Sequence, residues 1–175
     1  MENIEFNDEH KQEMGGSFIP EGVHKVKLGL ITFEKDDSDR VFADISVFDE
    51  EDREGNARLW FHTDGAKKYS FNTLRSIFVH NAPEDKKEAT REKINNLKNL
   101  EEMDAACQEL IGKECWYLVE RDPSRKYVGQ DGKERESLNR NVYGYEPKPS
   151  NPTPQPKEDV KTNSGDGDEP FPSNF

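Results

Sequence analysis

The sequence predicts a mainly β fold of five strands, with a helical region inserted between the third strand and the fourth. Residues 41–48 alternate between apolar and polar side chains, as in a half-buried strand. Between 66 and 111 the apolar residues recur every three or four positions instead, which is the period of a helix. Strand-like composition then returns at 114–121 and at 138–145.

The first three strands are separated by acidic turns. We expect the strands at 22–33, 40–48 and 58–63. The turns fall at 36–39 and 49–55, because clusters of Asp, Glu, Ser and Gly interrupt strands.

The helical region carries recognisable start and stop signals. Asp64 is the expected N-cap of its first helix, and Pro83 opens a second helical stretch. Asn99 followed by Glu102 resembles a capping box, so the second stretch is expected to be divided into two helices. Gly112 is the expected C-cap.

The last two strands are expected to be joined by a polar loop that contains Gly129 and Asp131-Gly132. Three strands, a helical connection and two more strands is the order of the five-stranded OB barrel, which places its helix between strands 3 and 4. A small β-sandwich or an α+β sheet would give the same order.

Composition divides the chain into three parts. Only 31% of its residues are hydrophobic and 35% are charged, so the core must be small. Residues 1–16 are expected to form a mobile acidic arm, and residues 17–146 the folded, OB-type nucleic-acid-binding domain. Residues 147–175 hold seven of the ten prolines and are expected to be a disordered, Pro-rich acidic tail.

The formal net charge of −12 alone argues against a phosphate-bearing partner, but the charge is unevenly distributed. Residues 34–55 hold ten acids and three bases, whereas 121–145 hold six bases and four acids. The acidic turns carry no recognisable site for a metal nuclease, and we expect no catalytic residue, cofactor or metal.

Aromatic and basic residues lie together on or beside the expected strands. Single-strand binders combine aromatic faces that stack on bases with cations that follow the phosphates. By strand alternation, Phe42, Phe48 and Trp60 share faces with polar neighbours and are the best stacking candidates, although large aromatic residues more often belong to the core. The candidate nucleic-acid-binding residues are Lys25, Lys27, Arg40, Phe42, Phe48, Arg58, Trp60, His62, Trp116, Arg121, Arg125, Lys126, Tyr127, Arg140 and Tyr143.

The sequence closes on an acidic segment that contains two phenylalanines. A tethered aromatic flanked by acids can fill a basic-rimmed pocket on a partner, whereas a purely solubilising tail has no need of aromatics. We also expect this segment to be attracted to the basic residues of 121–145. The candidate partner-binding residues are Asp166, Asp168, Glu169, Pro170, Phe171 and Phe175.

The tail resembles that of bacterial and phage single-stranded-DNA-binding proteins, which end in an acidic segment closing on Pro-Phe or Phe. The body is similar to OB-fold proteins of this kind from tailed phages. Pro170-Phe171 is followed here by four more residues, which leaves open whether Phe171 or Phe175 is the anchor. The matching segments are Gly22-Val23-His24-Lys25-Val26, Leu59-Trp60-Phe61, Gly112-Lys113-Glu114-Cys115 and Val142-Tyr143-Gly144-Tyr145.

The resemblance implies a protein that coats exposed single strands largely independently of sequence during replication, recombination or repair, and that recruits replication or recombination proteins through its tail. A non-catalytic protein-binding adaptor and an acidic nucleic-acid mimic are the alternatives, and a homo-oligomer is left open. No secretory signal and no membrane-spanning apolar run is apparent, so we expect a cytoplasmic protein (in the host cell if phage-encoded) whose Cys107 and Cys115 are reduced core residues.

Overall fold

The computed structural model describes residues 18–150. The expected arm and nearly all of the expected tail lie outside this range. Five antiparallel strands form one sheet in the order β3-β2-β1-β4-β5, and the sheet is not closed into a barrel. The strands are β1 (Gly22–Lys35), β2 (Val41–Phe48), β3 (Glu54–Trp60), β4 (Glu114–Val128) and β5 (Glu134–Tyr143).

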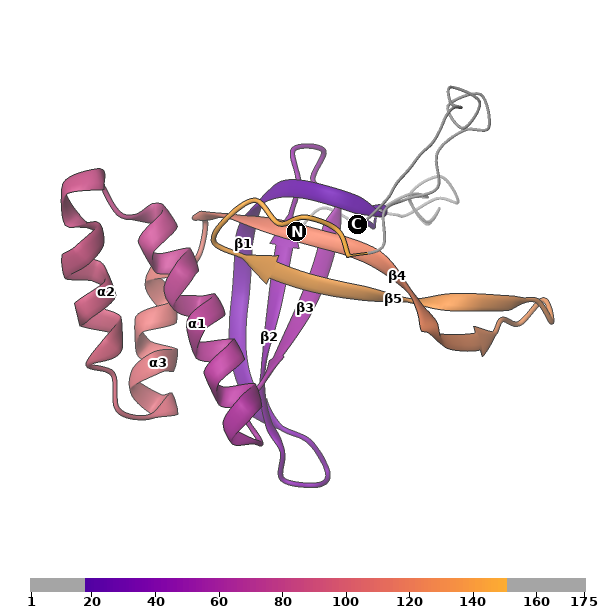
Figure 1. Ribbon diagram of the computed structural model, residues 1–175, viewed down its shortest axis with the longest axis horizontal. Coiled ribbons are helices and arrows are strands. Elements are labelled where there is room, and N and C mark those ends of the chain that lie inside the picture. Colours follow the sequence, from indigo (N-terminus) through magenta and orange to yellow (C-terminus); the bar gives the residue numbers. More distant parts are fainter. Residues whose placement is uncertain (1–17, 151–175) are drawn as a thin grey trace, which may run out of the picture.

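Three α-helices stack on one side of the sheet (Figure 1). Helix α1 packs against β3, β4 and β5, while α3 packs against β1. The mainly β class and the helical insertion between the third and fourth strands are therefore confirmed. The helices are α1 (Asp64–Asn81), α2 (Lys87–Asn95) and α3 (Leu100–Cys107), with short 3₁₀ turns at Glu84–Lys86 and Gln108–Leu110.

The helix boundaries follow from their caps. The Oδ1 atom of Asn99 accepts a hydrogen bond from the backbone N–H of Glu102, which confirms that the second helical stretch is divided there. The predicted cap at Asp64 is wrong by one residue. Thr63 is the N-cap, and its hydroxyl accepts a hydrogen bond from the N–H of Ala66. Asp64 is the first residue of the helix itself.

Strand β1 is shared by both halves of the sheet. Residues 22–27 pair with β4, and residues 27–35 pair with β2, with a bulge between Leu28 and Ile31. At the bulge, Ser46 Oγ accepts a hydrogen bond of 2.8 Å from the N–H of Leu30. The ring of Phe48 lies over Gly29, where a Cβ atom would come within 2.7 Å of it. The bulge bends β1, which lets one strand serve both halves.

One face of the sheet forms the core with the helices. Tyr117 is fully buried there, and its hydroxyl donates to Asn56 O at 2.9 Å and accepts from Asn56 N at 3.2 Å. This links β4 to β3 across the gap between the two sheet edges. Gly55 leaves room for the tyrosine ring, since a Cβ there would lie 2.7 Å from it. The largest fully buried residues include Ile45, Leu59, Leu74, Ile77, Ile94, Leu110 and Val142.

The predicted polar loop between the last two strands is only a short turn at 129–133. Strands β4 and β5 continue past the sheet and form a projecting hairpin, seen in Figure 1. Its residues are largely exposed on both faces, so they lack the apolar alternation by which strands are predicted. The prediction for β3 also began too late, at Arg58, because its first inward residues, Gly55 and Ala57, are small.

After β5 the chain returns along β4. The N–H of Ser150 donates to Glu120 at 2.8 Å, and Pro147 is buried. Gly144 lies directly against the backbone of α1, and its N–H donates to Ser76 Oγ at 3.1 Å. The end of β5 is thus held both to the helix and to the neighbouring strand.

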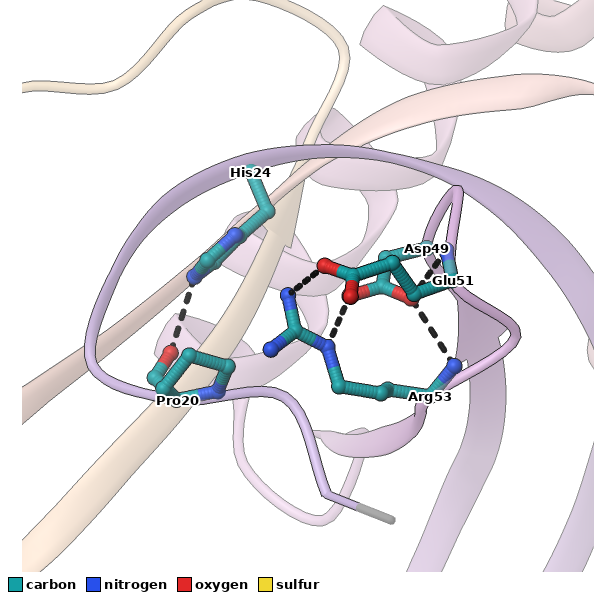
Figure 2. A network of polar contacts seen from close by, with 5 residues as sticks. All are labelled: Pro20, His24, Asp49, Glu51 and Arg53. Atoms are coloured by element: carbon teal, nitrogen blue, oxygen red, sulfur yellow. Dashed lines mark hydrogen bonds and ion pairs between the residues drawn. The ribbon is translucent and has the colours of Figure 1, made fainter. Parts of the chain in front are cut away.

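The two acidic turns share one structure. In each, the first aspartate accepts hydrogen bonds from two backbone N–H groups and pairs with the arginine four residues later: Asp36 with Arg40 at 2.8 Å, and Asp49 with Arg53 at 2.6 Å. Figure 2 shows the second turn, where Glu51 also pairs with Arg53. The residue before each arginine is an aspartate with positive φ. Hydrogen bonds from Arg40 and Ser38 lower the pKa of Asp36.

Figure 2 also shows His24 hydrogen-bonded to the carbonyl of Pro20 at 2.8 Å, which holds the start of β1 against the segment before it. Among residues 18–150, no helix combines the length and the apolar character needed to cross a membrane.

Both cysteines are free and fully buried, as the sequence predicts. Burial raises the pKa of each thiol to about 12. We therefore expect neither thiol to react with Ellman's reagent at pH 8 in the native protein, and both to react after unfolding in guanidinium chloride. Rapid modification of either cysteine without denaturant would contradict the packing described here.

Candidate nucleic-acid interface

The sheet face opposite the core carries most of the predicted aromatic candidates. On β2 and β3 the cross-strand pairs Phe42–Trp60 and Asp44–Arg58 are neighbours in the register. Together with two residues at the strand ends they form a cluster that we call the β2–β3 patch. The patch consists of Arg40, Phe42, Asp44, Arg58, Trp60 and His62.

The β2–β3 patch is built by stacking of cations on aromatic rings. The guanidinium carbon of Arg58 lies 3.8 Å from the centroid of Phe42 and 5.5 Å from that of Trp60. Arg40 also approaches Trp60, with its guanidinium carbon 4.9 Å from the centroid of the indole ring. The rings of Trp60 and His62 meet edge to face, with centroids 5.3 Å apart. The indole is only partly buried.

Phe42 lies deeper than its strand alternation indicates. Only 6% of its surface is exposed, so the predicted partial solvent contact is wrong. The reason is a neighbour on another strand: Arg58 covers the phenyl ring and Trp60 packs beside it, with centroids 5.3 Å apart. Phe42 therefore supports the patch from below, and Trp60 presents the aromatic surface.

Each arginine of the β2–β3 patch is held by a carboxylate. Arg58 donates two hydrogen bonds to Asp44, at 2.8 and 3.1 Å, and this bonding raises the pKa of Arg58 above its ordinary value. Arg40 is held by Asp36. These exposed pairs orient the guanidinium planes over the rings, although each contributes little to stability. A phosphate group could replace the carboxylates as the acceptor of the outward N–H groups.

A second aromatic group lies on the same face, closer to β4. Lys25 pairs in register with Trp116, which in turn pairs with Tyr143, and the Lys25 ammonium lies 5.7 Å from the Trp116 ring. Lys27 pairs with Phe48, which is 38% exposed.

The surroundings of this second group are acidic. A hollow of about 400 Å³ beside Lys25, Lys27 and Phe48 is also lined by Asp49, Glu50, Asp52 and Glu114. Lys25 is already paired with Glu114 at 3.6 Å. The four carboxylates here outnumber the two lysines, whereas the two arginines of the β2–β3 patch are matched by two carboxylates, Asp36 and Asp44. The β2–β3 patch is therefore the better placed of the two groups for a phosphate backbone.

The basic residues predicted at 121–145 do not join either group. Arg121 pairs with Glu21 at 2.9 Å, and Arg125 pairs with Asp122 at 3.0 Å on the projecting hairpin. Lys126 and Tyr127 are exposed on that hairpin, with Tyr127 50% exposed. By alternation along β5, Arg140 points to the side opposite Tyr143 and lines a hollow with Tyr117.

Several features of this face could not be found by sequence reasoning. Asp44 was not among the predicted site residues, yet it orients Arg58 across the strands. The only signal was its position two residues after Phe42 on an alternating strand. Leu30 is 65% exposed at the bulge. Its exposure could not be predicted, because the residue fits the alternation of an ordinary half-buried strand.

The part of the chain that the structure describes contains no group of three or more His, Cys, Asp or Glu side chains able to hold a metal ion. No protein-family model matches the sequence, and a search of curated proteins finds no similar one.

Proposed function

We propose that this protein binds single-stranded DNA without catalysing a reaction, and that the β2–β3 patch is the centre of its binding surface. The observation that carries the proposal is the partly exposed Trp60 indole, flanked by Arg40, Arg58 and His62 on the open face of the sheet. A base stacked on the indole would place its phosphates near both guanidinium groups. Every base has a π-face, so binding would be largely independent of sequence.

The strand order supports the finer assignment to the OB fold. In that fold strand 1 pairs with strands 2 and 4, and closure joins strand 3 to strand 5. The order β3-β2-β1-β4-β5 is the same arrangement opened between β3 and β5, and these two edge strands contact each other. Tyr117 spans the gap by its hydrogen bonds to Asn56.

The proposed biological role follows the resemblance of the sequence. The protein would coat exposed strands in the cytoplasm during replication, recombination or repair, inside the host cell if it is encoded by a phage. The acidic segment with Phe171 and Phe175 would recruit replication or recombination proteins.

A fluorescence titration tests the proposal. Adding poly(dT) to the full chain is expected to quench the emission of Trp60, and the affinity is expected to fall between about 50 and 200 mM salt, because cations that contact phosphates release counterions. A matched titration with duplex DNA should give a weaker response, since paired bases cannot stack on the indole.

Absence of quenching, together with absence of binding in an anisotropy assay with labelled poly(dT), would refute single-strand binding. That result would favour the protein-binding adaptor or the acidic nucleic-acid mimic, in which the carboxylates that hold Arg40 and Arg58 are permanent partners.

A further inference from the structure

An apolar hollow lies away from the β2–β3 patch, between helix α1 and the connection from α2 to α3. Its volume is about 500 Å³. Its floor and walls come from buried and half-buried apolar side chains, with Phe61 and Met103 the most deeply buried. We call it the helical pocket. It is lined by Phe61, Lys67, Lys68, Phe71, Asn72, Leu97, Lys98, Asn99, Leu100 and Met103.

The rim of the helical pocket is positively charged. Lys67, Lys68 and Lys98 are exposed, and within residues 18–150 none of them forms an ion pair. No acidic residue lines the pocket. The nearby Glu102 is engaged elsewhere, since its carboxylate accepts the N–H of Lys98 at 2.9 Å. In a chain with a net charge of −12, three unpaired lysines around an apolar pocket favour an acidic ligand with an apolar group.

The same chain contains a segment of that chemistry. Asp166, Asp168 and Glu169 lead directly into Pro170 and Phe171. A phenyl ring suits an apolar pocket of this size, and the three carboxylates match the three ammonium groups of the rim in number and sign.

The connecting chain is long enough for the segment to reach the pocket. Twenty residues lie between Ser150, where the described structure ends, and Phe171. Fully extended, they span roughly 70 Å, whereas a domain of this size has a radius of gyration of about 14 Å. Tethering keeps the local concentration of the segment high, so weak contacts suffice to populate a bound state.

We propose that residues 166–171 dock in the helical pocket of the same molecule, with the Phe171 ring inserted and the acids paired with Lys67, Lys68 and Lys98. This replaces the sequence-based expectation that the tail is attracted to 121–145. In that segment Arg121, Arg125 and Arg135 are each paired with a carboxylate of the body. The segment therefore has little net positive charge with which to attract the acidic tail. Docking would cover Phe171 until a partner with a tighter site displaces it.

The docked state can be tested by paramagnetic relaxation in the full chain. Ser173→Cys provides an attachment site for a nitroxide label two residues from Phe171, and the native cysteines are buried. At low salt the label is expected to broaden the signals of Leu97, Leu100 and Met103, while Val128 on the projecting hairpin is unaffected. Broadening should be lost in Phe171→Ala and retained in Phe175→Ala.

A matched pair of lysine variants tests the charge complementarity. Replacing Lys67, Lys68 and Lys98 together by alanine is expected to abolish the broadening. Replacing three other exposed lysines, Lys86, Lys113 and Lys133, by alanine changes the net charge equally and should preserve it. The loss should also appear above about 0.5 M salt, where charges are screened over a few ångströms.

Three results would overturn the proposal: no broadening at the helical pocket, broadening centred on the β2–β3 patch or the hairpin, or equal broadening in the two lysine variants. Equal broadening in ¹⁵N protein that carries no nitroxide, when it is mixed with spin-labelled protein, would overturn docking within one molecule. The readout contains no DNA, so it is independent of the proposed function.

Discussion

Replacing Trp60 by alanine is expected to weaken poly(dT) binding by about 1–3 kcal/mol, which is roughly 5- to 150-fold in affinity. The indole is the partly exposed ring of the β2–β3 patch, and it is contacted by Arg40, Arg58 and His62. The substitution removes the stacking surface and also releases Arg40 from the ring, so both the base and the phosphate contacts should weaken.

Two controls separate this effect from damage to the fold. Trp60→Phe keeps an aromatic face and should retain most of the affinity. Tyr127→Ala removes an exposed aromatic from the hairpin, outside the patch, and should leave the affinity nearly unchanged.

The stability of Trp60→Ala must be measured as well, because the indole packs beside Phe42. Loss of about 3–5 kcal/mol of unfolding free energy would indicate a core role for Trp60. Unchanged affinity in a well-folded variant would remove Trp60 from the binding surface.

The largest expected effect on folding is at Gly144. A Cβ atom there would overlap the backbone of α1 at Ser76 and lie 2.5 Å from the N atom of Ile77. Helix backbone cannot shift as a side-chain tip can, so Gly144→Ala must push β5 away from α1. We expect it to lower the free energy of unfolding by about 3 kcal/mol or more, measured by urea denaturation.

Gly65→Ala is the matched control. Gly65 belongs to α1, and nothing lies within 4 Å of a Cβ built on it. The substitution should be neutral or should stabilise the protein by up to about 1 kcal/mol, because alanine favours a helix over glycine. Equal stability of the Gly144 and Gly65 variants would mean that β5 does not pack against α1 as described.

The elements that could be predicted from sequence are those whose signal lies within one segment. The alternation of 41–48 located β2, and Asn99 with Glu102 located the start of α3. The projecting hairpin was missed because its residues contact solvent on both sides. Its stability comes from pairing with a partner strand rather than from an apolar face.

The candidate site was only partly predictable for a similar reason. Strand alternation places Arg58 and His62 on the same face as Trp60, and the structure brings these residues together. The contact of Arg40 with Trp60 comes from a different strand and could not be predicted from alternation. The burial of Phe42 depends on which side chain of β3 lies across from it, and strand register is not encoded in one strand alone. The sequence could not reveal the helical pocket, since its wall residues are far apart along the chain.

The shared structure of the two acidic turns has an evolutionary consequence. Each turn is closed by its first aspartate and its last arginine, and the side chains of Asp37, Ser38 and Glu50 form no hydrogen bond or ion pair with any other described residue. These three positions lie in the turns at the ends of the strands, and Glu50 also lines the hollow beside Lys25, Lys27 and Phe48. Mutation can therefore change the charge at these strand ends, and with it the choice of ligand, without disturbing strand pairing.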